Sequence, residues 1–283
     1  TSNEPRSANE LPSTVVVGAE RAVQLLADGD LRLLGPISSS SNYIYLCSVA
    51  DGDLRTLAIY KPLRGESPLW DFPRGTLGLR EVAAFLLSQV LGWPLIPPTV
   101  LRSGPHGPGA VQLYIDADPT AHYFTFPDAR LAELRPVALF DLVANNADRK
   151  GGHLLLDREG RIWAIDNALT FHEEPKLRTV IWDFAGDSIP ETDLADLLAL
   201  RRHLTDESGA LRRTLSQLLS ASPTARESPT ANRPDTTSTP SMLRRAATAS
   251  SAASVVTTKP APLPESATGA AAIIICAEPR RST

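Results

Sequence analysis

The chain of 283 residues contains only two cysteines and one methionine. Cys47 lies in an apolar run and Cys276 near the end of the chain, a pattern that gives neither a disulfide framework nor four zinc ligands. The polar residues 1–13 form no apolar core of a signal peptide. We therefore expect a cytoplasmic protein and exclude the disulfide-stapled and zinc-finger classes.

Aromatic side chains are absent from residues 221–283, where Pro, Ser, Thr and Ala dominate. Such a segment buries too little apolar surface to offset its conformational entropy, so we expect a disordered tail. Its apolar run at 270–276 is too short to span a bilayer. The tail carries seven Lys/Arg and four Asp/Glu, which leaves a net charge of −7 for residues 1–220. This acidic balance argues against a nucleic-acid partner.

The order of apolar patterns predicts an α+β fold rather than alternating βαβ units. After loose residues 1–14, we expect a helix at 19–27 and strands at 31–37, 43–49 and 54–61. A second helix at 78–91 and strands at 99–102 and 110–115 follow. Together they predict a small antiparallel sheet with one inserted helix. We then expect a helix, a hairpin and a broken helical stretch, at 130–145, 153–165 and 191–219. No phosphate-binding loop of the P-loop or Rossmann type is present.

A polar loop after the helix at 130–145 carries Asp148, Lys150 and His153. Phosphoryl transfer needs a carboxylate to orient the acceptor hydroxyl, cations near the phosphates and ligands for a divalent metal ion. The loop contains one residue of each kind, and a solvated turn is the equal alternative. His153 and Asp166 stand at the two ends of a predicted hairpin, so we expect them to lie side by side. They could then share one metal ion.

Lys61 ends an apolar strand. Residues 1–220 contain only three lysines against eighteen arginines. This bias hints that a compact ammonium group is needed there. Glu81 on the following helix can reach back to pair with it, although two surface charges are the equal alternative. A serine-rich turn with Ser39, Ser40 and Ser41 could hold phosphates through hydroxyl and N–H groups, or is simply a turn. We expect the four tryptophans in the core.

In their order along the chain, these residues resemble the protein-kinase superfamily, and most of all its phosphatidylinositol 3-/4-kinase-related branch. Asn-Ala-Asp-Arg at 146–149 is similar to the catalytic Asp-Arg of that branch. Ile-Asp-Asn-Ala-Leu-Thr-Phe at 165–171 is similar to its metal segment Ile-Asp-Asn-Gly-Leu-x-Phe. A family of actinobacterial kinase-like proteins is more similar still. The resemblance covers residues 31–184, with a weaker extension to 219.

The resemblance implies a two-lobed protein-kinase-like fold, with an N-lobe at about 15–116 and a reduced helical C-lobe at about 117–220. It also implies that ATP and a divalent metal ion, Mg²⁺ or Mn²⁺, are cofactors. The implied residues are catalytic Asp148 and Lys150, nucleotide-binding Lys61, Glu81, Ser39, Ser40, Ser41, Gln112, Leu113 and Tyr114, and metal-binding His153 and Asp166.

We therefore expect a phosphotransferase that uses ATP and a metal ion, with a protein, a lipid or a small molecule as its acceptor. His153 stands where the family pattern has Asn, and no glycine lies in the serine-rich turn. His153 and the reduced C-lobe favour an alternative, a pseudokinase that binds nucleotide or acts as a scaffold without turnover. A structural or partner-binding domain is the third hypothesis.

Overall fold

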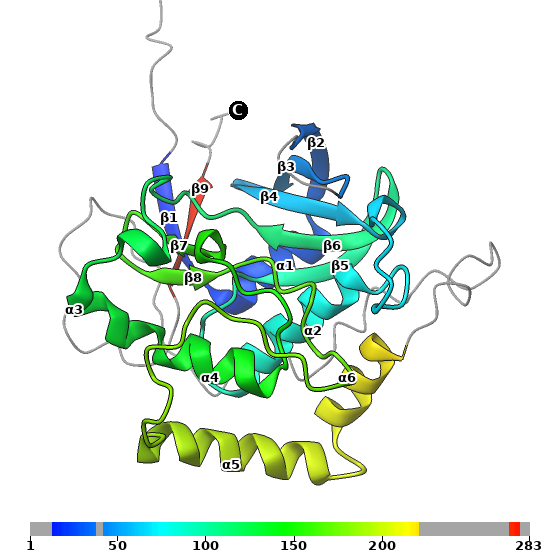
Figure 1. Ribbon diagram of the computed structural model, residues 1–283. Helices are drawn as coiled ribbons and strands as arrows, with labels where there is room; N and C mark the ends of the chain where they lie inside the picture. The colour runs from blue at the N-terminus through cyan, green and yellow to red at the C-terminus, as the bar shows by residue number, and fades with distance from the viewer. Residues whose placement is uncertain (1–12, 38–41, 221–271, 278–283) are drawn as a thin grey trace, which may run out of the picture.

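The computed structural model describes residues 13–37, 42–220 and 272–277 (Figure 1). The strands in these ranges form one seven-stranded sheet and a separate two-stranded hairpin, and every strand pair is antiparallel. The helices lie mainly in the second half of the chain. The predicted α+β class is therefore confirmed. No helix of the described residues is long and apolar enough to cross a membrane.

Five strands of the large sheet follow the predicted order. They are β2 (Asp30–Pro36), β3 (Tyr45–Asp51), β4 (Leu54–Pro62), β5 (Thr99–Gly104) and β6 (Gly107–Leu113). The first three form a meander, and the β5–β6 hairpin joins it through β6 and β4. Gly52, with φ of 59°, makes the tight turn between β3 and β4, because glycine adopts this left-handed backbone without steric cost. Opposite Lys61 on β4 lies Ala110 on β6.

Two further strands lie outside the predicted set. β1 (Ser13–Gly18) pairs along its whole length with β9 (Ala272–Ala277), which also pairs with β4 at Leu54 and Arg55. Both are short and rich in β-branched residues, as strands commonly are. Residues 272–277 fall within the predicted tail, and only the strand itself is a correction. Residues 1–12, 221–271 and 278–283 lie outside the described residues, so disorder there stays a prediction.

Two helices cover opposite faces of the sheet (Figure 1). α2 (Leu77–Val90) lies on the face that carries Lys61, because its Glu81 pairs with that lysine. α1 (Ala19–Asp28) lies on the other face, where Arg102 of β5 donates to the backbone carbonyls of Leu26 and Gly29. Residues opposite each other in a sheet share a face, and side chains alternate along each strand. The sheet thus presents Lys61 on the face of α2 and not on the face of α1.

Apart from η1 (Leu63–Gly65) before α2, the remaining elements follow β6 of the large sheet in the sequence. They are η2 (Tyr123–Thr125), α3 (Asp128–Leu131), η3 (Ala132–Leu134), α4 (Arg135–Val143), η4 (Gly151–His153), β7 (Leu154–Leu156), β8 (Ile162–Ala164), α5 (Glu191–Thr205) and α6 (Ala210–Leu219). The region predicted as one helix at 130–145 is helical over most of its length, but it is divided into α3, η3 and α4. Pro136 stands in the first turn of α4 and cannot continue an earlier helix, because its nitrogen has no hydrogen to donate.

Two hydrophobic clusters form most of the core. The larger joins the sheet to α1, α2 and α6. The smaller includes Phe126, Val137 and Leu154 and lies under α4 and the β7–β8 hairpin. Trp93 and Trp163 are buried as predicted. Trp70 and Trp182 are 92% and 58% exposed, so the expectation of a core position is wrong for these two.

Candidate active site

Lys61 lies where three segments of the chain meet. It stands near the end of β4, and its ammonium pairs with the carboxylate of Glu81 on α2. The same Nζ lies 3.4 Å from Oδ1 of Asp166, which follows β8. The Glu81 side chain is 1% exposed, and that of Lys61 is 20% exposed. The predicted Lys61–Glu81 pair therefore forms, and it brings Asp166 to the same point.

The charges in this group stabilise one another. Burial alone would lower the pKa of Lys61, but the Glu81 and Asp166 carboxylates raise it above its ordinary value. Partial burial would raise the pKa of Asp166, yet the Lys61 ammonium and the His153 imidazole hold it below its ordinary value. Lys61 and Asp166 are consequently both charged at neutral pH. Asp166 has a left-handed backbone, with φ of 55°, which Asp adopts more readily than most residues.

The polar loop after α4 holds Asp148 and Lys150 beside each other. Nζ of Lys150 lies 2.8 Å from Oδ2 of Asp148, and this contact raises the pKa of Lys150. The Asp148 side chain is 35% exposed and that of Lys150 is 64% exposed, so both can reach a bound molecule. The backbone N–H of Asp148 donates to Oδ1 of Asn146 over 3.1 Å. Asn146 thus holds the backbone of the loop, while the side chains of Asp148 and Lys150 stay accessible to solvent.

His153 and Asp166 lie side by side, as the hairpin predicts. Nε2 of His153 is 3.4 Å from Oδ2 of Asp166. Burial lowers the pKa of His153 below its ordinary value, so the imidazole is neutral at pH 7. Nδ1 accepts a hydrogen bond from the backbone N–H of Lys150 at 3.3 Å, so Nε2 carries the proton that faces Asp166. Nε2 would have to give up this proton to bind a metal ion.

A buried polar network below the site was not predicted. Arg149 and Asp141 form an ion pair at 2.9 Å, and both side chains are 0% exposed. Arg149 also donates to Oδ1 of Asn167 at 2.6 Å, and the N–H of Asn167 donates to Glu81. The available signal was a charged residue, Asp141, within an otherwise apolar helical pattern. No group of three or more His, Cys, Asp or Glu that could hold a metal ion forms in the described part of the chain.

Gln112, Leu113 and Tyr114, predicted to bind the nucleotide, lie at the end of β6 and just beyond it, where they form hydrogen bonds to neighbouring segments. The Gln112 amide donates to Oγ1 of Thr99 at 2.9 Å inside the sheet. The backbone N–H groups of Leu113 and Tyr114 donate to the carbonyls of Pro98 and Leu57. Gln112 does lie on the same sheet face as Lys61. It is opposite Ile59, which stands two positions before Lys61 on β4, and Lys61 itself is opposite Ala110. The predicted phosphate-binding residues are Ser39, Ser40 and Ser41, and they lie outside the described residues.

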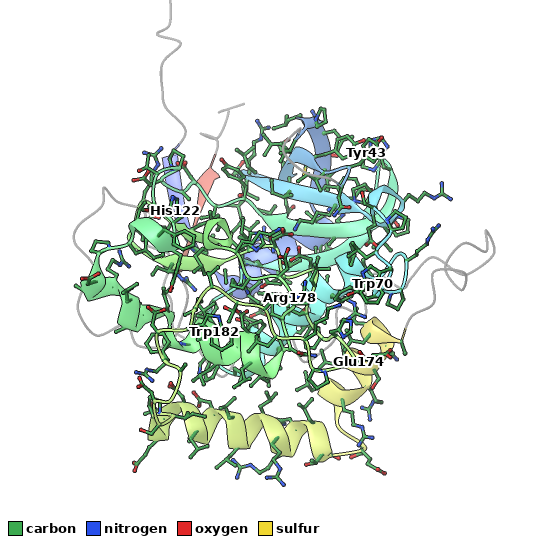
Figure 2. All side chains as sticks on the ribbon, in the orientation of Figure 1. Tyr43, Trp70, His122, Glu174, Arg178 and Trp182 are labelled. Atoms are coloured by element: carbon green, nitrogen blue, oxygen red, sulfur yellow. The ribbon has the colours of Figure 1, made fainter. Side chains whose placement is uncertain are left out.

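The segment that follows Asp166 carries exposed side chains. Figure 2 shows Arg178 between Trp70 and Trp182, and all three are exposed. The backbone of Arg178 bonds to the loop of Asp148, since its N–H donates to Asn146 and its carbonyl accepts from Arg149. Arg178 and Trp182 therefore belong to a segment that is hydrogen-bonded to the loop of the candidate site.

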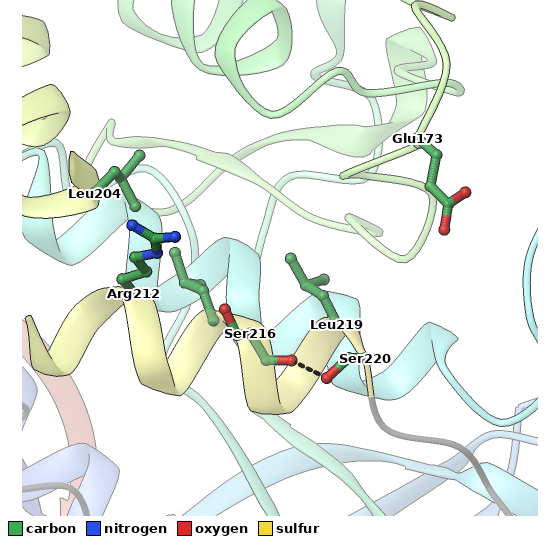
Figure 3. Close-up of a pocket in the computed structure, with 7 residues that line it drawn as sticks. Glu173, Leu204, Arg212, Ser216, Leu219 and Ser220 are labelled. Carbon is green, nitrogen blue, oxygen red and sulfur yellow. Dashed lines mark hydrogen bonds between the residues drawn. The ribbon is translucent and has the colours of Figure 1, made fainter. Parts of the chain in front are cut away.

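A separate hollow lies beside α6, away from the residues described so far. Leu204 of α5, Leu215 and Leu219 of α6, and Glu173 are among its lining residues, and its volume is about 450 Å³ (Figure 3). None of the predicted site residues lines it. We therefore place the chemistry at the convergence of charges around Lys61 and not in this hollow.

A lysine of the sheet is paired with a glutamate of the neighbouring helix, and two aspartates follow, one in a polar loop and one beyond it. This arrangement defines a protein-kinase-like domain. No protein-family model matches the chain. The chain is 39% identical over 244 residues to protein Rv2133c of Mycobacterium tuberculosis. The match spans 69% of this chain and 87% of the relative. The chain therefore belongs to the same family as protein Rv2133c.

Two solved structures are similar at low sequence identity. Hydra Fam20, solved with sugar, matches 71% of this chain and 80% of its own, with a TM-score of 0.42 and 16% identity. The kinase PK-1 of Cydia pomonella granulovirus matches 53% of this chain and 57% of its own, with a TM-score of 0.30 and 16% identity. These superpositions are too loose to transfer any residue role to this chain.

Proposed function

We propose that this chain is an ATP- and metal-dependent phosphotransferase. The observation that carries the proposal is the position of the Lys61 ammonium, paired with Glu81 and 3.4 Å from Asp166. Nucleotide phosphates require a fixed cation next to a carboxylate that can hold a metal ion. Glu81 is buried and charged groups surround Lys61, so the ammonium is held in place before any nucleotide binds.

Roles for the remaining residues follow from their positions. Lys61 would hold the phosphates of ATP near the donor end of the site. Asp148 would orient the acceptor hydroxyl and accept its proton, as the acceptor oxygen attacks the γ-phosphorus and the bond to ADP breaks. Lys150, 2.8 Å from Asp148, would neutralise charge on the transferring group. The identity of the acceptor follows from none of these contacts.

The donor set fits a hard divalent cation. Mg²⁺ is commonly held by one or two carboxylates, by water and by substrate phosphates, so a cage of protein ligands is not required. The Asp166 carboxylate is 52% exposed and ionised, and it would hold the ion. The bound ion would neutralise phosphate charge. His153 fits this role less well, because its Nε2 proton faces Asp166 and its Nδ1 accepts from Lys150.

The proposal is tested by ADP release from ATP in the presence of Mg²⁺ or Mn²⁺. Asp148→Asn should lower the rate by a factor of about 10² to 10⁴, the usual contribution of a positioned general base. The matched control is Asp187→Asn, which alters an exposed ion pair with Arg135 elsewhere on the chain. The proposal fails if wild-type protein releases no ADP, or if Asp148→Asn and Asp187→Asn are equally active.

A pseudokinase is the second candidate, and one observation favours it. The Asp148 carboxylate is already engaged in an ion pair with Lys150 at 2.8 Å, so one of its oxygens has a partner before any acceptor hydroxyl binds. A rise in the thermal unfolding temperature with ATP and Mn²⁺, without ADP release, would support this function. Absence of any shift with nucleotide would instead point to a structural or partner-binding domain.

A further inference from the structure

Arg149 is a buried cation whose side chain bonds to Asp141 on α4 and to the loop of Asp166. Its side chain is 0% exposed, as is that of its partner Asp141 on α4. Nε donates to both carboxylate oxygens of Asp141, at 3.2 and 3.1 Å, and Nη2 donates to Oδ1 at 2.9 Å. This bidentate geometry uses the planar guanidinium in a way that a lysine ammonium cannot reproduce.

One set of contacts leads from Arg149 to the loop of Asp166. Nη1 donates to the backbone carbonyl of Ile165 at 2.8 Å, and Nη2 donates to Oδ1 of Asn167 at 2.6 Å. These two residues flank Asp166 on either side, where the backbone is left-handed with φ of 55°. The guanidinium therefore holds the backbone before Asp166 and the side chain after it, and touches neither carboxylate oxygen of Asp166 itself.

A second set of contacts leads from Asp141 to the loop of Asp148. Oδ1 of Asp141 accepts from Nδ2 of Asn146 at 2.8 Å. Oδ1 of Asn146 then accepts from the backbone N–H of Asp148 at 3.1 Å. Thr179 donates to the other oxygen of Asp141 at 3.2 Å, so both carboxylate oxygens have partners. A single ion pair is therefore bonded to the surroundings of both candidate site carboxylates.

We propose that the Arg149–Asp141 pair is a positioning unit, which sets how Asp148 and Asp166 are placed relative to each other during phosphoryl transfer. This inference rests on the proposed function. Two observations distinguish it from general stabilisation. A buried ion pair is often no more stabilising than an apolar pair of the same volume. Moreover, within the described residues the side-chain hydrogen bonds of this pair run to the two loops and to Thr179, and none runs to the large sheet or to α2.

The test is steady-state ADP release by the full-length Arg149→Lys variant. Lysine keeps the charge beside Asp141 but cannot reach Asp141, Ile165 and Asn167 together. We expect kcat to fall about 10- to 100-fold, because small displacements of reacting groups carry large losses in rate. We expect KM for ATP to change less than about threefold, because Lys61 and Glu81 are untouched. Mn²⁺ affinity, measured by the paramagnetic resonance of the free ion with ATP present, should also weaken.

The matched control is Arg102→Lys. Arg102 is also a partly buried arginine that donates to two carbonyls, but these lie on Leu26 and Gly29 beneath the sheet. This variant should lose stability and keep wild-type kcat per folded molecule. If Arg149→Lys does not accumulate as folded protein, Asn167→Ala is the second variant. It removes the Arg149 contact beside Asp166 together with the bond from the Asn167 amide to the Ala164 carbonyl, leaves the Arg149–Asp141 pair intact, and should show the same split between kcat and KM.

The outcomes separate the two proposals. A wild-type protein that releases no ADP overturns the proposed function, and the positioning role with it. An active wild type with Arg149→Lys or Asn167→Ala at wild-type kcat overturns the positioning role alone. Equal losses of kcat in Arg149→Lys and Arg102→Lys, after correction for the folded fraction, would also overturn it, because they would reflect stability only.

Discussion

The backbone N–H of Asn167 donates to Oε2 of Glu81 over 3.1 Å, between residues that are 86 positions apart in the sequence. The other oxygen of Glu81 binds Lys61. One buried carboxylate therefore joins β4, α2 and the loop of Asp166. Because Glu81 is 1% exposed, loss of either partner leaves polar groups that water cannot reach.

Replacement of Lys61 by methionine should affect stability and nucleotide binding separately. Lys61→Met leaves the Glu81 carboxylate buried and unpaired, so we expect a loss of about 3 kcal/mol in the free energy of unfolding. Affinity for ATP should fall about 10- to 100-fold with the charge-assisted contact. Urea unfolding and calorimetric titration measure the two effects. Lys61→Met with Glu81→Gln should recover most of the stability and none of the affinity. A double variant as unstable as the single one would contradict this explanation.

Two neighbouring glycines of η4 should respond differently to the same substitution. A Cβ added at Gly151 would lie 2.5 Å from the ring of Phe124, whereas one at Gly152 would meet nothing within 4 Å. Gly151→Ala should therefore displace η4, which begins beside Lys150, and lower kcat about 10-fold. Gly152→Ala is the matched control and should remain active. Phe124→Ala in the Gly151→Ala background should restore activity, and failure to do so would exclude the steric cause.

Cys47 should make stability fall at alkaline pH. Burial raises the pKa of its thiol from 9.0 to about 11, while the Arg102 cation opposes this shift. Above about pH 9 the unfolded chain releases this proton and the folded chain retains it, so the contribution is present below pH 9 and is lost as the pH rises to about 11. The loss is about 3 kcal/mol, since each pKa unit corresponds to roughly 1.4 kcal/mol. Cys47→Ala should lose less stability over this interval in urea unfolding. Parallel curves for both proteins would rule out this role.

Proline substitutions should test whether β9 is part of the sheet. Successive N–H groups of a strand point to opposite sides, so Ile273→Pro or Ile274→Pro must remove a hydrogen bond to β1. The more affected variant should unfold at a temperature about 2–4 °C lower, for a loss of about 1 kcal/mol. Thr283→Pro, beyond the strand, is the control. Equal unfolding temperatures for all three variants and the wild type would show that β9 contributes nothing.

Much of the candidate site was predictable from local pattern. The strand that ends near Lys61 is followed by the helix of Glu81, and the β7–β8 hairpin begins next to His153 and ends before Asp166. Short connections bring neighbouring elements together, so these pairs could be expected to meet. The break between α5 and α6 could also be expected at Gly209, because glycine favours helix ends. In each case the information lies within a few tens of residues.

The sequence by itself determined the α+β class, most of the element order and the residue types of the site. Only the tertiary structure decided that β9 joins β1 from the far end of the chain, that Trp70 and Trp182 are exposed, and that Arg149 is buried against Asp141. The physical reason is that hydrophobic periodicity and turn residues act over neighbouring positions, while strand pairing and burial of charge depend on contacts between distant segments. A buried arginine and an exposed one have the same letter in the sequence, and their partners distinguish them.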